Sequence, residues 1–193
     1  MTDFPELRTW IDGHAYESEV VDGARLHDPN TGAVLAESRS SSPAQVERAI
    51  AAAAAAHAAG EWAGMGIEGR APLLSAFADE LDAVAEHSAR LDSLNSGVPI
   101  SVTRLFAGSA AATVRSAVAH ARAAGDAREL EADGREVVVH RIPWGPAALI
   151  LPWNAPSAMA VKKLAYALAS GAPAVLKPSS ASPWSAQLVA AAS

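Results

Sequence analysis

The sequence of 193 residues contains no cysteine, which removes disulfides, zinc–thiolate sites and a cysteine nucleophile from this chain. Lysine is scarce as well, since three lysines, all between positions 162 and 177, stand against twelve arginines. No apolar run approaches the roughly eighteen residues of a membrane span, and the first residues lack the basic and apolar regions of a secretion signal. Acidic side chains outnumber basic ones by 21 to 15, and this net charge of −6 argues against a nucleic-acid-binding face. We therefore expect a soluble cytoplasmic protein with one domain, or slightly more, and a real core.

The first sixty residues carry turn and helix-start signals. Glycine with aspartate or asparagine at 10–13 and 28–32 predicts turns between short strands. Ser42 is followed by proline and then by Gln45, which predicts a helix with a capping box. The alanine-rich stretch after it has high helix propensity, so we expect this helix to continue to Gly60.

The central part of the chain has helical spacing of apolar residues. It predicts helices over 71–93 and 101–124, separated by a break at 95–99. A change of character follows Gly125, where β-branched residues flank a central Asp-Gly pair. This pattern predicts a β-hairpin over 129–141.

The last fifty residues predict a βαβ unit. Wholly apolar strands at 147–151 and 174–177 surround a helical segment at 157–170, so the strands should be parallel with a right-handed crossover. The fold class is therefore α/β, with an open parallel, Rossmann-like sheet that is incomplete in this chain. Another helix begins near 182–184, and the sequence stops within it, so we expect a cut sequence.

Two polar side chains follow the two strands of this unit. Asn154 comes just after the first strand, and Lys177 ends the second. Because ligands bind beyond the carboxyl ends of strands in open α/β sheets, an amide and an ammonium here can face one ligand. Spacing alone leaves open the plainer interpretation that Asn-x-Pro is a turn and that Lys-Pro ends a strand.

The segments 152–156 (PWNAP) and 176–180 (LKPSS), together with Lys163, closely resemble the aldehyde dehydrogenase superfamily. The resemblance extends over nearly the whole chain, because 28–32 is similar to the family's "NPATG"-like turn and 95–100 to its "LDTGKPI" region. It implies the N-terminal part of that fold and, for the intact protein, oxidation of an aldehyde to a carboxylic acid with NAD or NADP. The pocket pattern is most similar to succinate-semialdehyde dehydrogenases.

The resemblance also assigns roles to single residues. Asn154 matches the family's oxyanion-hole asparagine, a donor of a kind typically worth ~3 kcal/mol in the transition state. Lys163 matches a lysine used in proton relay. The cofactor-binding positions implied in this chain are Leu151, Pro152, Trp153, Lys177, Ser179 and Ser180.

Ser180 departs from the pattern of NAD-preferring relatives, which carry a glutamate there. A carboxylate accepts from the ribose 2′-hydroxyl and repels a 2′-phosphate, whereas a serine does not repel it. We therefore favour NADP, or both cofactors, over NAD alone. The open alternative is that serine merely loses one contact and leaves dual specificity.

Three positions imply a substrate pocket. Ala155 stands where many relatives have a bulky aromatic residue, which widens the tunnel, and Met159 lies in the same segment. Lys162 takes the place of an arginine that contacts the substrate carboxylate in succinate-semialdehyde dehydrogenases, so an anionic aldehyde is favoured. The alternative is that Lys162 extends to solvent. The six histidines show no metal-ligand spacing, and we expect no metal site.

The resemblance implies that the cysteine nucleophile and the glutamate base lie beyond residue 193. We expect an N-terminal fragment that is inactive alone, against the alternative of a natural truncated, non-catalytic relative that binds or assembles. The implied division is 1–124 as the N-terminal part of the cofactor-binding domain, 125–141 as the hairpin of an oligomerisation arm, and 142–193 as the first βαβ unit. This arm implies a homodimer or homotetramer.

Overall fold

The N-terminal part consists of two antiparallel hairpins. The computed structural model describes residues 4–193, beginning with β1 (Arg8–Ile11) and β2 (His14–Glu17), then β3 (Glu19–His27) and β4 (Val34–Ser40). Asp12 and Gly13 connect β1 to β2 with φ of 52° and 72°, which is the left-handed conformation that aspartate and glycine tolerate best. The side chain of Asp28 accepts from the backbone N–H of Asn30 at 2.8 Å in the turn before β4. Both predicted turns are confirmed.

The first long helix, α1 (Pro43–Ala59), has the predicted cap. The Ser42 hydroxyl accepts from the N–H of Gln45, and the Gln45 side chain accepts from the N–H of Ser42. Gly60 ends the helix with a positive φ of 71°. A single turn, α2 (Glu61–Gly64), follows.

The two helices predicted over 71–93 and 101–124 are each divided in the structure. The first comprises α3 (Gly66–Ala83) and α4 (Ala85–Ser96), and the second α5 (Ile100–Gly108) and α6 (Ala110–Ala124). The interruptions lie at Val84 and Ser109, where ψ is close to zero. Ser109 follows a glycine, and its hydroxyl donates to the carbonyl of Phe106, which competes with regular helical bonding.

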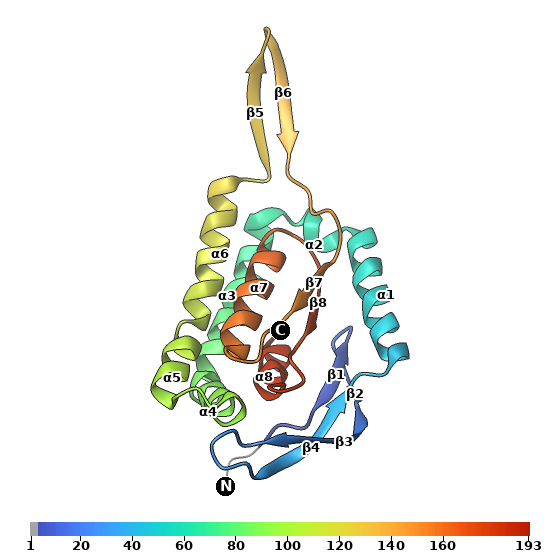
Figure 1. Ribbon diagram of the computed structural model, residues 1–193. Coiled ribbons are helices and arrows are strands. Elements are labelled where there is room, and N and C mark those ends of the chain that lie inside the picture. Colours follow the sequence, from blue (N-terminus) through green and yellow to red (C-terminus); the bar gives the residue numbers. More distant parts are fainter. Residues whose placement is uncertain (1–3) are drawn as a thin grey trace.

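The predicted hairpin is confirmed as β5 (Ala127–Ala132) and β6 (Arg135–His140). Asp133 and Gly134 form its turn with φ of 51° and 72°. The hairpin projects away from the rest of the molecule (Figure 1), and the strand β6 is exposed along its whole length.

The βαβ unit is confirmed as β7 (Ala147–Ile150), α7 (Pro156–Ala169) and β8 (Ala174–Lys177), with the two strands parallel. The described chain is therefore of the α/β class, as expected, and contains one parallel βαβ unit. The helix α8 (Trp184–Ala192) follows and lies under α7 in Figure 1.

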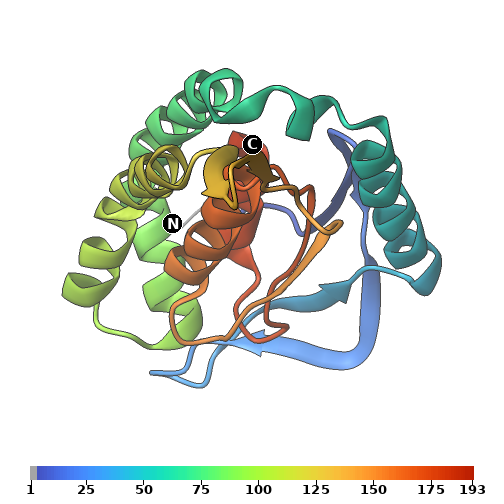
Figure 2. The same cartoon turned by 90° about the horizontal axis from the view of Figure 1, so that it is seen from above.

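One hydrophobic core joins the central helices to this unit. Its buried side chains come from α3, α6, α7 and α8, together with Leu151 after β7. Figure 2 shows α7 between α3 and α6 on one side and the β7–β8 strands on the other, with α1 on the far side of the strands. A smaller cluster around the buried Trp184 attaches the N-terminal hairpins. The proposed division at residues 124 and 141 stays a prediction. Within residues 4–193, no helix is long and apolar enough to cross a membrane.

Candidate functional site

The ends of β7 and β8 lie side by side. Ile150 is in register with Lys177, and the N–H of Leu151 donates to the carbonyl of Lys177 at 3.1 Å. The parallel hydrogen bonding therefore continues one residue past β7. It brings the segment that contains Asn154 and the segment that begins at Lys177 to the same edge of the sheet.

The segment between β7 and α7 presents its polar groups to solvent. Trp153 is 56% exposed, and Asn154 is exposed as well. The Asn154 amide makes no hydrogen bond with residues 4–193. Ala155 occupies the N-cap position of α7, and Pro156 takes the first helical position, which suits a residue without an N–H. The amide at 154 is thus available as a donor.

At the end of β8, Lys177 and Ser180 are exposed, and Ser179 is partly buried. The ammonium of Lys177 donates to the adjacent carbonyl of Pro178 at 3.1 Å. The Ser179 hydroxyl accepts from the N–H of Ala181 at 3.2 Å, while Ser180 is exposed. These contacts are local, so the ammonium and the Ser180 hydroxyl remain accessible.

The helix α7 places its two lysines differently. The Lys163 ammonium donates to the carbonyl of Ile150 at 2.6 Å and so lies against the end of β7. Lys162 is exposed and makes no hydrogen bond or ion pair within the described part of the chain. Met159 is partly buried and packs against the main core. The structure brings Lys163 to the strand end and leaves Lys162 in solvent.

A buried carboxylate that sequence reasoning missed lies at the N-terminus of α7. Asp92 on α4 is 1% exposed and accepts from both the hydroxyl and the N–H of Ser157. Burial raises the pKa of the Asp92 carboxyl, and the hydrogen bonds of Ser157 and the hydroxyl of Ser185 oppose that rise. The sequence carries no signal for its burial, because the polar residues 88, 92, 95 and 96 share one face of α4, and a polar face predicts exposure to solvent, whereas the structure buries all four.

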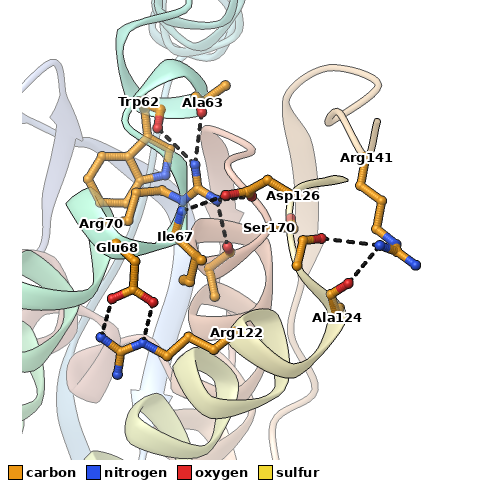
Figure 3. Close-up of polar contacts among 12 residues, drawn as sticks. Trp62, Ala63, Ile67, Glu68, Arg70, Arg122, Ala124, Asp126, Arg141 and Ser170 are labelled. Atoms are coloured by element: carbon orange, nitrogen blue, oxygen red, sulfur yellow. Dashed lines mark hydrogen bonds and ion pairs between the residues drawn. The ribbon is translucent and has the colours of Figure 1, made fainter. Parts of the chain in front are cut away.

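The second residue that sequence reasoning missed is Arg70 on α3, whose guanidinium lies at the C-terminus of α7 (Figure 3). Its guanidinium is buried and donates to the carbonyl of Ala169 at 3.2 Å. The Arg70 guanidinium also forms an ion pair with Asp126, whose other oxygen accepts from the N–H of Ile67 at the start of α3. Gly171, two residues after α7, has a φ of 89°, and a Cβ there would lie 3.2 Å from the guanidinium, so glycine suits this position.

The comparisons with known proteins identify the family. The sequence profile of the aldehyde dehydrogenase family matches residues 16–193, almost the whole chain. The chain belongs to the aldehyde dehydrogenase family. The family predicted from the motifs at 152–156 and 176–180 is thereby confirmed.

Individual relatives agree with this assignment. The 3,6-anhydro-alpha-L-galactose dehydrogenase of Streptomyces coelicolor is 37% identical over 163 residues, or 84% of this chain and 33% of that protein. The NADP/NAD-dependent aldehyde dehydrogenase PuuC of Escherichia coli is 34% identical over 183 residues, or 94% of this chain and 37% of that protein. The crystal structure of aldehyde dehydrogenase 21 from Physcomitrella patens in complex with the reaction product succinate matches with a TM-score of 0.83 and 27% identity. The match covers 96% of this chain and 39% of that structure.

This aldehyde dehydrogenase chain therefore spans little more than a third of these relatives. Among the described residues, no group of three or more histidines and carboxylates could hold a metal ion. The candidate site consists of an amide, two lysines and two serines near the ends of two parallel strands.

Proposed function

We propose that this chain provides the oxyanion donor and cofactor contacts of an NAD(P)-dependent aldehyde dehydrogenase that oxidises an aldehyde to a carboxylic acid. One observation carries the proposal. The Leu151–Lys177 hydrogen bond joins two strand ends, and each strand end is followed by an exposed polar group that matches the family's functional residues. Because ligands of open α/β sheets bind at such edges, one ligand-bearing site can use both segments.

The proposed role of Asn154 is to donate its free amide to the aldehyde oxygen as negative charge develops there. A donor of this kind is typically worth ~100–1,000-fold in kcat. The adduct needs a thiolate nucleophile, and this chain has no cysteine. The nucleophile must therefore come from sequence other than these 193 residues. The family resemblance implies the same for the glutamate base that activates water.

Lys163 is proposed to hold or pass a proton next to this site. Its ammonium lies at the end of β7, where one of its three donors is used by the carbonyl of Ile150. The remaining two donors are available to a relay of water and side chains.

The cofactor is proposed to bind along the segment after β8, with additional backbone contacts from Leu151, Pro152 and Trp153. A bound NAD or NADP supplies the hydride acceptor. The accessible ammonium of Lys177 suits ribose hydroxyls, and Ser179 and Ser180 present no carboxylate to a 2′-phosphate. NADP, or both cofactors, is therefore the proposed choice, and the relative PuuC is named for both.

The substrate is proposed to be an anionic aldehyde. The exposed ammonium of Lys162, which has no partner among residues 4–193, and the small side chain of Ala155 favour such a substrate, and Met159 borders the same part of α7. A relative of the same fold is described with bound succinate, a dicarboxylate product. Comparison of kcat/KM for succinate semialdehyde and for a neutral aldehyde of equal length tests this.

The intact protein is proposed to be a cytoplasmic homodimer or homotetramer. The hairpin β5–β6 projects from the body, and Val137, Val138 and Val139 on β6 are 39–48% exposed, so it can pair with another subunit. Light scattering tests the assembly, and fractionation of the source cells tests the location.

The decisive experiment begins with the intact mass of the protein isolated from its source cells. Its turnover is then measured with NAD and NADP, for the wild type, Asn154→Ala and the matched control Asn30→Ala, which lies in the exposed turn before β4. We expect the change at Asn154 to lower kcat ~100-fold or more and the control to leave it unchanged. Cofactor binding without any aldehyde turnover would contradict the proposal and favour a non-catalytic relative.

A further inference from the structure

The N-terminus of α7 lacks a cap from its own sequence. Ala155 occupies the N-cap position and has no side-chain oxygen to accept from the first N–H groups. The acceptor comes instead from Asp92, which lies 65 residues earlier in the sequence. Its Oδ2 accepts from the N–H of Ser157 at 3.3 Å and also from the Ser157 hydroxyl.

This contact is fixed by its surroundings. Asp92 and Ser157 are 1% and 2% exposed, so water does not compete for the two hydrogen bonds. A negative carboxylate at a helix N-terminus is also favoured by the helix dipole. Any change of Asp92 that weakens these bonds therefore releases the first turn of α7.

The residue most affected by such a release is Asn154. The segment 152–155 is anchored on one side by the bond from Leu151 to Lys177 and on the other by the first turn of α7. The Asn154 side chain has no hydrogen bond with the described residues that would hold it otherwise. Its orientation therefore depends on those two anchors.

We propose that Asp92 is a positioning residue that fixes the Asn154 amide by capping α7 through Ser157. This inference rests on the proposed function, in which Asn154 is the oxyanion donor. Asp92 does not touch the reacting atoms in this arrangement. It acts on them through Ser157 in the first turn of α7 and the adjoining segment 152–155.

The test is a double-mutant cycle in the natural protein that contains this chain. Asp92→Asn keeps the shape but loses the charge, and we expect kcat to fall ~10–100-fold, because small displacements of a catalytic group cost about that much. In the Asn154→Ala background the same change should alter kcat less than ~2-fold, since the group through which it acts is already absent. If Asp92→Asn lowers kcat by the same factor in the Asn154→Ala background as in the wild type, the two residues act independently and the proposal is overturned. An unchanged kcat in Asp92→Asn would overturn it as well.

If Asp92→Asn does not fold, two serine variants that disturb the structure less provide the test. Ser157→Ala removes one of the two hydrogen bonds to Asp92 but keeps the carboxylate at the N-terminus of α7, so it should lower kcat by a smaller factor, ~3–10-fold. Ser88→Ala is the matched control, because this buried serine on α4 makes no side-chain hydrogen bond with the described residues. Equal effects of the two serine changes on kcat would indicate a general packing role and contradict the proposal.

A readout independent of turnover separates this inference from the proposed function. The side-chain amide signals of Asn154 in nuclear magnetic resonance spectra are assigned by their loss in Asn154→Ala. They should shift or broaden in Asp92→Asn and in Ser157→Ala, and stay in place in Ser88→Ala. Unchanged Asn154 signals would overturn the positioning role. Absence of aldehyde turnover in the wild type would instead refute the proposed function.

Discussion

Replacement of Arg70 by methionine should destabilise the protein strongly. Its guanidinium is 2% exposed and donates to the carbonyls of Trp62, Ala63 and Ala169 at 3.0–3.2 Å, and to the carboxylate of Asp126 at 3.4 Å. Methionine fills a similar volume but supplies no donor, so these acceptors lose their partner. Buried acceptors left unpaired cost about 1–3 kcal/mol each, and broken buried ion pairs about 3–5 kcal/mol. Because Asp126 is half exposed and regains water, we expect a total loss of about 3–5 kcal/mol.

The measurement is urea unfolding of purified protein, followed by circular dichroism. Arg122→Met is the matched control, since Arg122 forms a two-bond ion pair with Glu68 at 2.7–2.8 Å that is exposed on both sides. Exposed pairs contribute less than about 1 kcal/mol. A free energy of unfolding for Arg70→Met within about 1 kcal/mol of that control would refute this account of Arg70.

Three further predictions concern other parts of the chain. Ser180→Glu should lower kcat/KM for NADP at least ~10-fold relative to NAD, because a carboxylate repels the 2′-phosphate, and retained NADP turnover would refute our account of this residue. Ser42→Ala should lower the free energy of unfolding by about 1 kcal/mol through loss of the helix cap, measured by urea unfolding. Hydrogen bonds from Arg104 and Arg90 hold the pKa of Glu86 at about 2, below its ordinary 4.5. The ionised Glu86 therefore stabilises the folded protein fully above pH 4.5, and this stabilisation is lost as the pH falls towards 2. Between these two pH values the melting temperature of Glu86→Gln should vary less with pH than that of the wild type.

Elements with a local chemical cause were predictable from sequence. The serine cap of α1 and the Asp-Gly turns depend on residues within four positions of each other. The strands β7 and β8 were visible in the sequence as continuous apolar runs, and the helix between them as a segment with helical spacing of apolar residues. Because parallel strands end at the same edge of a sheet, the sequence also predicted that Asn154 and Lys177 lie at one edge.

What remained hidden depends on partners far away in the chain. Asp92 and Arg70 are charged residues in helices, which composition alone places on the surface. Their burial depends on partners that include Ser157 and Ala169, which are 65 and 99 residues away. The interruptions at Val84 and Ser109 were hidden for a related reason, since the apolar spacing continues across both.

These two buried charges hold opposite ends of the same helix. Asp92 places a carboxylate at the N-terminus of α7, and Arg70 places a guanidinium at its C-terminus, so each charge complements the helix dipole. Their consequences should differ, because the N-terminus adjoins the segment of Asn154, whereas the C-terminus leads through Gly171 into β8. We therefore expect Arg70→Met to lower stability with little change in kcat per folded molecule, and Asp92→Asn to lower kcat more than stability explains. The ratio of the loss in kcat to the loss in free energy of unfolding is compared between the two variants. If this ratio is the same in both, α7 responds as one rigid body, and neither end positions the site separately.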